Sequence, residues 1–114
     1  MKNRPDVLHG QTHEIKLDTI PDPIYLTIND RDGKPYEVFI NCNDPVQLAW
    51  SPVASRLISA VLRNKGDNDF LYKELQELFS AEYFFYKGKK WHSIIQLIGS
   101  ILETHAQELK ETWE

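Results

Sequence analysis

The sequence predicts an α+β fold in which a small antiparallel sheet of three to four strands packs against three helices. Two patterns support this prediction. Apolar residues alternate with other residues through most of 13–41, and from residue 51 onward they recur at helical spacing. Because the strands come first and the helices follow, we expect the helices to cover one face of the sheet. The length of 114 residues fits a single domain.

The most regular strand pattern is a hairpin over residues 24–41. Apolar residues alternate in both halves, and Gly33 lies in the polar turn RDGK between them. Glycine tolerates positive φ, so this turn is expected to be tight. In the returning strand, alternation places Tyr36 on the same face as Val38 and Ile40.

The segment before the hairpin divides into two parts. Residues 1–12 are polar, contain Pro5 and Gly10, and show no sustained period, which predicts a flexible N-terminal arm. Residues 13–20 alternate and predict a further strand. The expected organisation is therefore an arm followed by one α+β domain over residues 13–114.

Three helices are predicted after the sheet. Ser51 is expected to cap the first helix, with Pro52 in its first turn and Gly66 closing the segment. Asp69 and Ser93 are the expected caps of the second and third helices. The apolar faces comprise Val53, Leu57, Ile58, Val61 and Leu62; then Leu71, Leu75, Leu78 and Phe79; then Ile94, Leu97, Ile98, Ile101, Leu102 and Leu109, running to Trp113.

Composition excludes several classes of protein. The net charge of −4 is the opposite of a globally basic nucleic-acid binder, so any contact with phosphate must be local. The single cysteine, Cys42, excludes an internal disulfide and a cysteine-rich zinc site. No stretch approaches the length of a membrane span, and the N-terminus lacks the apolar core of a signal peptide. We therefore expect a cytoplasmic protein without membrane contact.

The sequence contains no recognisable catalytic or cofactor-binding arrangement. Its pairs of carboxylate residues lie in segments that are expected to be exposed to solvent. The sequence contains no glycine-rich phosphate-binding loop and no G-x-S-x-G nucleophile elbow. His9 and His13 have the spacing of zinc ligands on a helix, but strand alternation begins at His13. We therefore expect no catalytic residues, no metal and no cofactor, and a protein that is not an enzyme.

The stretch YFFYKGKKW (83–91) combines aromatic rings with lysines and allows three interpretations. The simplest is a strand of packing aromatics followed by a solvated turn, because aromatics are ordinary in strands. In the second, Lys87, Lys89, Lys90 and Trp91 bind single-stranded nucleic acid. In the third, the strand is an interface, most simply of a homodimer, since a strand apolar on both faces needs cover on both. The candidate interface residues are Tyr83, Phe84, Phe85 and Tyr86.

The residues after this stretch sharpen the binding hypothesis. Ser93 opens an apolar helix, and a helix N-terminus presents free N–H groups to an anion. The lysines immediately before it add positive charge. We therefore expect a phosphate or acidic-peptide site that comprises Lys87, Lys89, Lys90, Trp91, His92 and Ser93.

Three stretches together resemble the TSCPD domain, which occurs near the C-terminus of many ribonucleotide reductase large chains and as separate small proteins. They are IYLTINDRDGKPYEVFIN (24–41), SRLISAVLRNKG (55–66) and YKGKKWHSIIQLIGSILETH (86–105), of which the first is the most specific. The family takes its name from a Thr-Ser-Cys-Pro-Asp run at the start of the last helix. Here that place reads His92 to Gln96, and Ile94 replaces the cysteine.

The resemblance implies an accessory domain rather than a catalytic one. No radical cysteine, thiol pair or cobalamin site is carried over to this chain, and a reductase barrel does not fit in 114 residues. The expected function is a non-catalytic binding or regulatory module that acts through a protein partner, such as a reductase chain, or through its own homodimer. Nucleic-acid binding by residues 83–93 is the alternative.

Overall fold

The computed structural model describes residues 3–64 and 66–112. They form a three-stranded antiparallel sheet in the order β1-β2-β3, a separate two-stranded sheet and four helices. The α+β fold is therefore confirmed. The elements are β1 (His9–Ile15), β2 (Ile24–Arg31), β3 (Lys34–Asn41), α1 (Pro45–Leu48), α2 (Ser51–Leu62), α3 (Asp69–Gln76), β4 (Phe84–Tyr86), β5 (Lys89–Trp91) and α4 (Ile94–Thr112).

The predicted hairpin is confirmed as β2 and β3. Its turn consists of Asp32 and Gly33, which have φ values of 54° and 76°. Positive φ at both central residues is typical of a type I′ turn, whose twist matches that of the strands. Asp followed by Gly is a preferred pair for this geometry, so the tip of the hairpin is fixed by local sequence.

A bulge near the hairpin tip changes the expected face of Tyr36. Asn29 pairs with Glu37, whereas Asp30 pairs with Pro35, so Tyr36 has no partner of its own. The alternation that placed Tyr36 on one face with Val38 and Ile40 did not allow for this register shift. Those two side chains are buried, but Tyr36 is half-buried.

The first strand begins earlier than predicted. β1 pairs with β2 without interruption from His9 to Ile15, so residues 9–12 are not part of a flexible arm. The pattern misled because most of these side chains are exposed, and only Ile15 is fully buried. Arg4, which lies before the strand, is also engaged, since its guanidinium bonds the carboxylate of Glu37.

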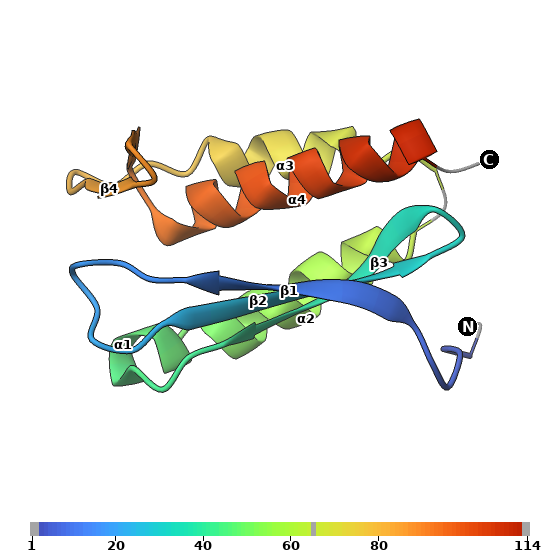
Figure 1. The fold of residues 1–114 in the computed structure, drawn as a ribbon, viewed down its shortest axis with the longest axis horizontal. Helices are drawn as coiled ribbons and strands as arrows, with labels where there is room; N and C mark the ends of the chain where they lie inside the picture. Colours follow the sequence, from blue (N-terminus) through green and yellow to red (C-terminus); the bar gives the residue numbers. More distant parts are fainter. Residues whose placement is uncertain (1–2, 65, 113–114) are drawn as a thin grey trace.

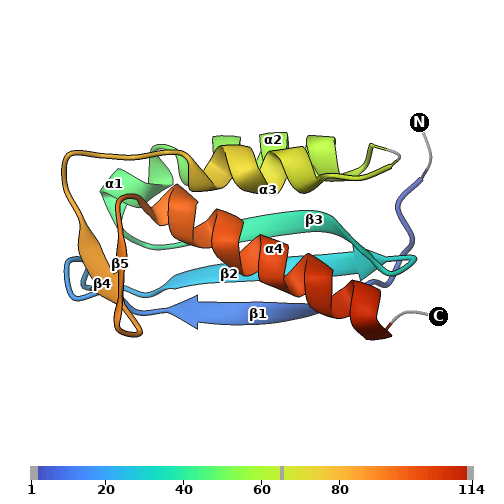
Figure 2. The ribbon, with the colours of Figure 1, turned by 90° about the horizontal axis from the view of Figure 1, so that it is seen from above.

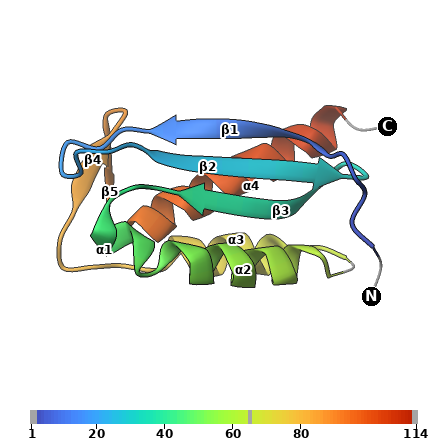
Figure 3. The same ribbon diagram turned by 90° about the horizontal axis from the view of Figure 1, so that it is seen from below.

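Helix α2 lies along the free edge of β3 (Figure 3). The hydroxyl of Ser59 accepts a hydrogen bond from the N–H of Val38 at 3.0 Å and donates one to its carbonyl at 3.1 Å. The hydroxyl of Ser55 accepts a hydrogen bond from the N–H of Ile40 at 2.9 Å. Two serines of one helix thus satisfy backbone groups that an edge strand normally leaves open.

Helix α4 crosses one face of the sheet, and α3 packs beside α4 (Figures 1 and 2). The core between α4 and the sheet includes Ile15, Leu26, Ile28, Ile98 and Leu102, all fully buried. α3 approaches α4 closely at Gly99, where an added Cβ would lie 2.7 Å from Cβ of Leu75. The opposite face of the sheet is not covered by a described helix, and Tyr25 and Phe39 are exposed on it.

The helix boundaries agree with prediction better than the caps do. Ser93 caps α4 as predicted, since its hydroxyl accepts the N–H of Gln96 at 2.9 Å. α2 begins at Ser51, but its N-cap is Trp50, and the Ser51 hydroxyl is buried without a partner among the described residues. Asp69 is the first residue of α3 rather than its cap.

The predicted apolar faces are only partly buried. Ile58 and Leu62 of α2 are buried, but Val53 and Leu57 are exposed. Leu78 and Phe79 follow the end of α3 and are exposed, contrary to prediction. Trp113 lies outside the described residues. Among the helices that are described, none is both long and apolar enough to cross a membrane.

Candidate functional site

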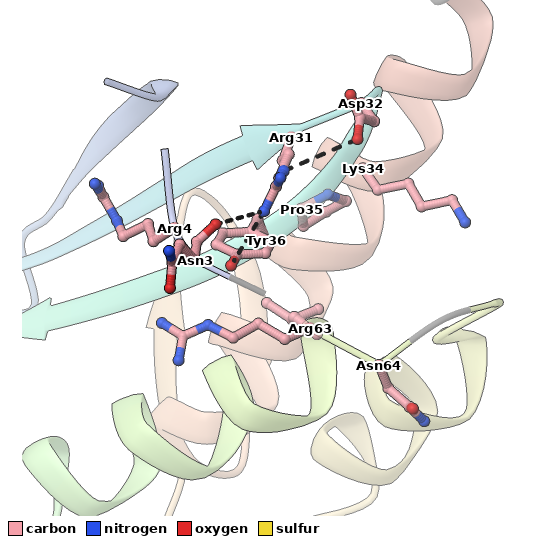
Figure 4. A pocket seen from close by; sticks show the side chains of 10 residues that line it. Asn3, Arg4, Arg31, Asp32, Lys34, Pro35, Tyr36, Arg63 and Asn64 are labelled. Carbon is pink, nitrogen blue, oxygen red and sulfur yellow. Dashed lines mark hydrogen bonds and ion pairs between the residues drawn. The ribbon is translucent and has the colours of Figure 1, made fainter. Parts of the chain in front are cut away.

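A cavity of about 750 Å³ lies beside the tip of the β2–β3 hairpin (Figure 4). Three segments that are distant in sequence form its walls: the segment before β1, the hairpin, and the C-terminal end of α2 with the residues that follow it. Its volume is within the range of small-molecule sites in proteins. The lining residues are Asn3, Arg4, Arg31, Asp32, Lys34, Pro35, Tyr36, Leu62, Arg63 and Asn64.

The ring of Tyr36 lies among cations in this cavity. The guanidinium carbons of Arg31 and Arg63 are each 5.3 Å from the centroid of the ring. Arg31 Nη1 is also 3.5 Å from the Tyr36 hydroxyl oxygen and 3.4 Å from the carbonyl oxygen of Asn3. Cation–π contact with a tyrosine face orients an arginine while leaving its N–H groups available to other partners.

A buried carboxylate organises one side of the cavity. Glu37 is 1% exposed and accepts hydrogen bonds from Arg4 Nε at 2.9 Å, Arg4 Nη2 at 3.0 Å and Asn29 Nδ2 at 2.8 Å. Arg63 Nη2 lies 3.5 Å from the same carboxylate. The hydrogen bonds from Arg4, then the one from Asn29, hold the pKa of Glu37 below its usual value. Glu37 is therefore a structural counter-ion and a weak base.

The glycine at position 10 makes this arrangement possible. Gly10 pairs with Asn29 across β1 and β2, and a Cβ at Gly10 would lie only 2.2 Å from Oδ1 of Asn29. Without a side chain at Gly10, Asn29 can lie across β1 and direct its amide to Glu37. A residue expected to belong to a loose arm is thus required by the buried carboxylate.

The cavity is positively charged in an acidic protein. Four cationic side chains line it, and with Asp32 and the carboxylate of Glu37 counted they leave an excess of two positive charges. The whole chain carries −4. The side chains of Arg4, Arg31 and Arg63 are 41%, 30% and 38% exposed, so their guanidinium groups can be reached from solvent. Such a site favours anions with several oxygen atoms.

A second cavity of about 400 Å³ lies on the other side of the hairpin tip. The two cavities share Asp32, Lys34 and Pro35. The second is lined in addition by Gly33, Gly66, Asp67, Asn68, Asp69, Tyr72, Ala106 and Lys110. Burial raises the pKa of Tyr72 to about 12. The hairpin tip is therefore the common wall of a basic and a more acidic cavity.

The residues predicted from sequence form a different feature, the hairpin of β4 and β5. Lys87 and Gly88 form its turn, with φ values of 51° and 77°. The lysines lie against aromatic rings: Lys87 is 5.4 Å from the centroid of Tyr86, Lys89 is 4.6 Å from that of Trp91, and Lys90 is 4.2 Å from that of Tyr83. Trp91 is buried, whereas Tyr83 and Phe85 are exposed and Phe84 and Tyr86 are half-buried.

Ser93 and His92 contribute to the start of α4. The Ser93 hydroxyl donates to the carbonyl of Leu78 at 2.6 Å, and the N–H of His92 donates to Oε1 of Gln96 at 2.8 Å. The hydroxyl at the predicted anion site is therefore engaged within the chain. The structure places Lys87 to Ser93 on one hairpin and helix start. Anion binding there stays a prediction.

Comparison with known families bears on the whole chain. The family model of the TSCPD domain matches residues 1–106, which include every residue lining the basic cavity. The chain belongs to the TSCPD domain family. A search of the curated proteins and a search of the solved structures each give no significant match. At the place of the family's name-giving run, this TSCPD domain has Ser93 as a helix cap and Ile94 partly buried against the core.

Sequence reasoning did not find the basic cavity of this TSCPD domain. Its arginines, Arg4, Arg31 and Arg63, lie in three separate segments, and no local spacing relates them. One signal was available, since the stretch 24–41 carries the most specific part of the resemblance and contains Arg31, Lys34 and Tyr36. Among the residues that the structure describes, no group of three or more metal-ligating side chains is found.

Proposed function

We propose that this TSCPD domain is a non-catalytic binding module whose ligand is a small phosphate-bearing molecule held in the basic cavity at the β2–β3 hairpin. The observation that carries the proposal is the gathering of Arg4, Arg31, Lys34 and Arg63 around Tyr36 in a chain of net negative charge. Arginine forks match the geometry of phosphate oxygens and bind them in bidentate fashion.

Arg31 is the residue best placed to bind the ligand first. Arg4 and Arg63 already contact the carboxylate of Glu37, whereas the carboxylate nearest to Arg31 is the exposed Asp32, at 3.9 Å. A phosphate group therefore gains more from Arg31 than from the two partly neutralised arginines. Tyr36 adds a ring edge and a hydroxyl that suit a ligand with an attached planar group.

The cavity also suggests how binding would regulate a partner. Arg4 belongs to the segment before β1, and it is held to the sheet by Glu37. An anion in the cavity competes with Glu37 for Arg4 and Arg63, so occupancy shifts the position of this segment. We propose that a protein partner, of which a reductase large chain is the first to test, or a second copy of the domain reads this change.

Isothermal titration with inorganic pyrophosphate, ATP and citrate tests the proposal. We expect binding of the two phosphate compounds that weakens with salt, and weaker binding of citrate. Arg31→Ala is expected to lower the affinity at least about tenfold, which corresponds to about 1.4 kcal/mol. Arg56→Ala is the matched control, because Arg56 is an exposed arginine of α2 outside the cavity. Absence of phosphate binding by the wild-type protein, or an equal effect of both variants, would overturn the proposal.

A second candidate function is binding of single-stranded nucleic acid by the β4–β5 hairpin. The observation in its favour is that Lys90 lies 4.2 Å from the ring centroid of Tyr83 while Tyr83 and Phe85 are exposed. Exposed rings beside lysines are the elements of a stacking surface.

Fluorescence anisotropy with single-stranded DNA and RNA at about 50 mM salt tests this candidate. The triple variant Lys87→Ala/Lys89→Ala/Lys90→Ala should abolish binding. A triple variant at Lys16, Lys73 and Lys110, which lie outside the hairpin, should retain it. Equal binding by the two triple variants rejects the candidate.

A further inference from the structure

The two edges of the main sheet differ in how their backbone groups are satisfied. At the β3 edge, Ser59 bonds the N–H and the carbonyl of Val38, and Ser55 bonds the N–H of Ile40. At the β1 edge, no backbone hydrogen bond joins residues 9–15 to any described residue outside the sheet. The sheet is therefore closed on one side and open on the other.

The register identifies which groups of β1 face outward. The N–H of Val38 points to α2, so Val38 and its partner Ile28 are a non-hydrogen-bonded pair of β2 and β3. Ile28 then directs its backbone groups to Gln11 of β1. By alternation, Gly10, Thr12 and Glu14 direct theirs away from the sheet, and all three are exposed.

Most of the usual protections of an edge strand are missing from β1, in which Glu14 is the one acidic residue. Natural edges are blunted by proline, lysine, a bulge or a covering helix. The strand HGQTHEI contains neither proline nor lysine, and its pairing with β2 runs through seven residues without a register shift. Figure 3 shows β1 as the outer strand of the sheet; α4 runs behind the sheet, and only its C-terminal end passes the free edge of β1.

We propose that β1 pairs antiparallel with β1 of a second copy of this chain, about a two-fold axis at Thr12. Thr12 is the central residue of β1, so this register pairs the whole strand with itself. It sets Thr12 opposite Thr12 and Glu14 opposite Gly10 and forms about six backbone hydrogen bonds. A two-fold axis at Glu14 would set the two carboxylates opposite each other, which is unfavourable.

Side chains on the exposed face suit the same register. The hydroxyls of Thr12 and Thr27 lie 2.9 Å apart across β1 and β2. With Thr12 opposite its copy, a row of four threonines crosses the centre of a continuous six-stranded sheet. Threonine pairs are favourable cross-strand neighbours. The pairing specifies how a second copy of the domain, named above as a possible partner, would bind. It does not depend on ligand binding in the basic cavity.

Cross-linking gives the sharpest test. Paired Cα atoms in a hydrogen-bonded antiparallel pair are about 5.5 Å apart, which is within the range of a disulfide. Thr12→Cys should therefore form a covalent dimer on mild oxidation, because the only native cysteine, Cys42, is buried. Gln11→Cys is the matched control, since Gln11 lies opposite His13 of the copy. Tyr83→Cys tests the alternative interface at β4. Cross-linking at Gln11 or Tyr83 but not at Thr12 would overturn the proposal.

Sedimentation velocity of unmodified chains gives the second test. The wild-type protein and Thr12→Val should be dimers, and Thr12→Pro should be a monomer, because proline removes an outward N–H without breaking a bond to β2. Thr12→Val also loses the hydrogen bond to Thr27 but keeps the backbone N–H, so it separates the effect of the side chain from that of the backbone. A monomeric wild-type protein, or a dimeric Thr12→Pro, contradicts the pairing. Pyrophosphate titration of Thr12→Pro separates this proposal from that of the cavity, since a monomer with unchanged affinity retains the site.

Discussion

Three serines of α2 allow the same substitution to alanine to be tested on a single helix: Ser59 and Ser55 bond the β3 edge, and Ser51 does not. Ser59→Ala removes the partner of both the N–H and the carbonyl of Val38, which is 1% exposed. Each buried backbone group left unsatisfied costs about 1–3 kcal/mol, and the better helix propensity of alanine returns about 0.5 kcal/mol. For the two groups together, we expect the free energy of unfolding to fall by about 1.5–5.5 kcal/mol.

Ser55 and Ser51 provide the graded controls. Ser55→Ala removes the partner of one N–H, at Ile40, and Ser55 is half-buried, so a loss of about 1 kcal/mol is expected. Ser51 is 1% exposed, and its hydroxyl has no partner among the described residues. Ser51→Ala should therefore be neutral or stabilising by up to about 1 kcal/mol, since it removes a buried polar group.

Urea denaturation at one fixed protein concentration measures all three variants. The concentration is fixed because self-association shifts apparent stability. Amide hydrogen exchange adds a local readout: the Val38 amide should exchange faster in Ser59→Ala, and the Ile40 amide in Ser55→Ala. A loss below about 0.5 kcal/mol for Ser59→Ala, or an equal loss for Ser51→Ala, would refute the reasoning that the hydroxyls satisfy the edge.

Three further predictions concern buried groups. Glu37→Gln should lower the free energy of unfolding by about 1–3 kcal/mol at pH 7. The pKa of Glu37 is below its usual value of 4.5 in the folded protein, so its contribution is complete above that pH and lost as the pH falls through the folded pKa. The difference in free energy of unfolding between the wild-type protein and Glu37→Gln should therefore become smaller as the pH falls. A difference that stays constant down to about pH 2 would contradict the ion pair. Gly99→Val should cost about 1–3 kcal/mol in thermal denaturation, because its Cβ meets Leu75; an unchanged transition would show that α3 can move away. Burial raises the pKa of Tyr72 to about 12, so the free energy of unfolding should fall as the pH rises above 10. Ultraviolet titration should show one tyrosine that ionises at higher pH than the others, and this step should be missing in Tyr72→Phe.

Elements with a local signal were predictable from the sequence. The Asp32–Gly33 pair flanked by alternating apolar residues indicated the hairpin, and its type I′ turn follows from those two residues. Ser93, followed by an apolar periodic run, indicated the start of α4, and its hydroxyl caps the helix. In each case the residues that determine the structure lie within a few positions of one another.

The strand β1 was misread because its residues pair through the backbone. Gly10 and Thr12 face a solvated surface, so they leave no apolar alternation to detect. The start of α2 was placed correctly at Ser51. The reason given was wrong, because Ser51 was expected to cap the helix and its hydroxyl has no partner among the described residues. Periodic sequence patterns indicate where helices and strands lie, but they do not identify hydrogen-bond partners.

The candidate site could not be identified without the fold, because its residues come from segments that are distant in sequence. Arg4, Arg31 and Arg63 meet only because β1 lies beside β2 and α2 lies beside β3. The lysines of 87–90 were conspicuous because three of them fall within four residues, yet each lies against a nearby aromatic ring. Clustering in sequence and clustering in space thus pointed to different surfaces.

The serine contacts along β3 also limit how far the sheet can extend. An intruding strand finds the N–H and carbonyl of Val38 and the N–H of Ile40 already occupied by α2. Within the described part of the chain, the main sheet can therefore add a strand at its β1 edge only, and two chains joined there leave that sheet no open edge. An assembly joined at β1 would therefore stop at two chains and would not extend into a fibril. This limit would protect the protein from aggregation through its open edge strand.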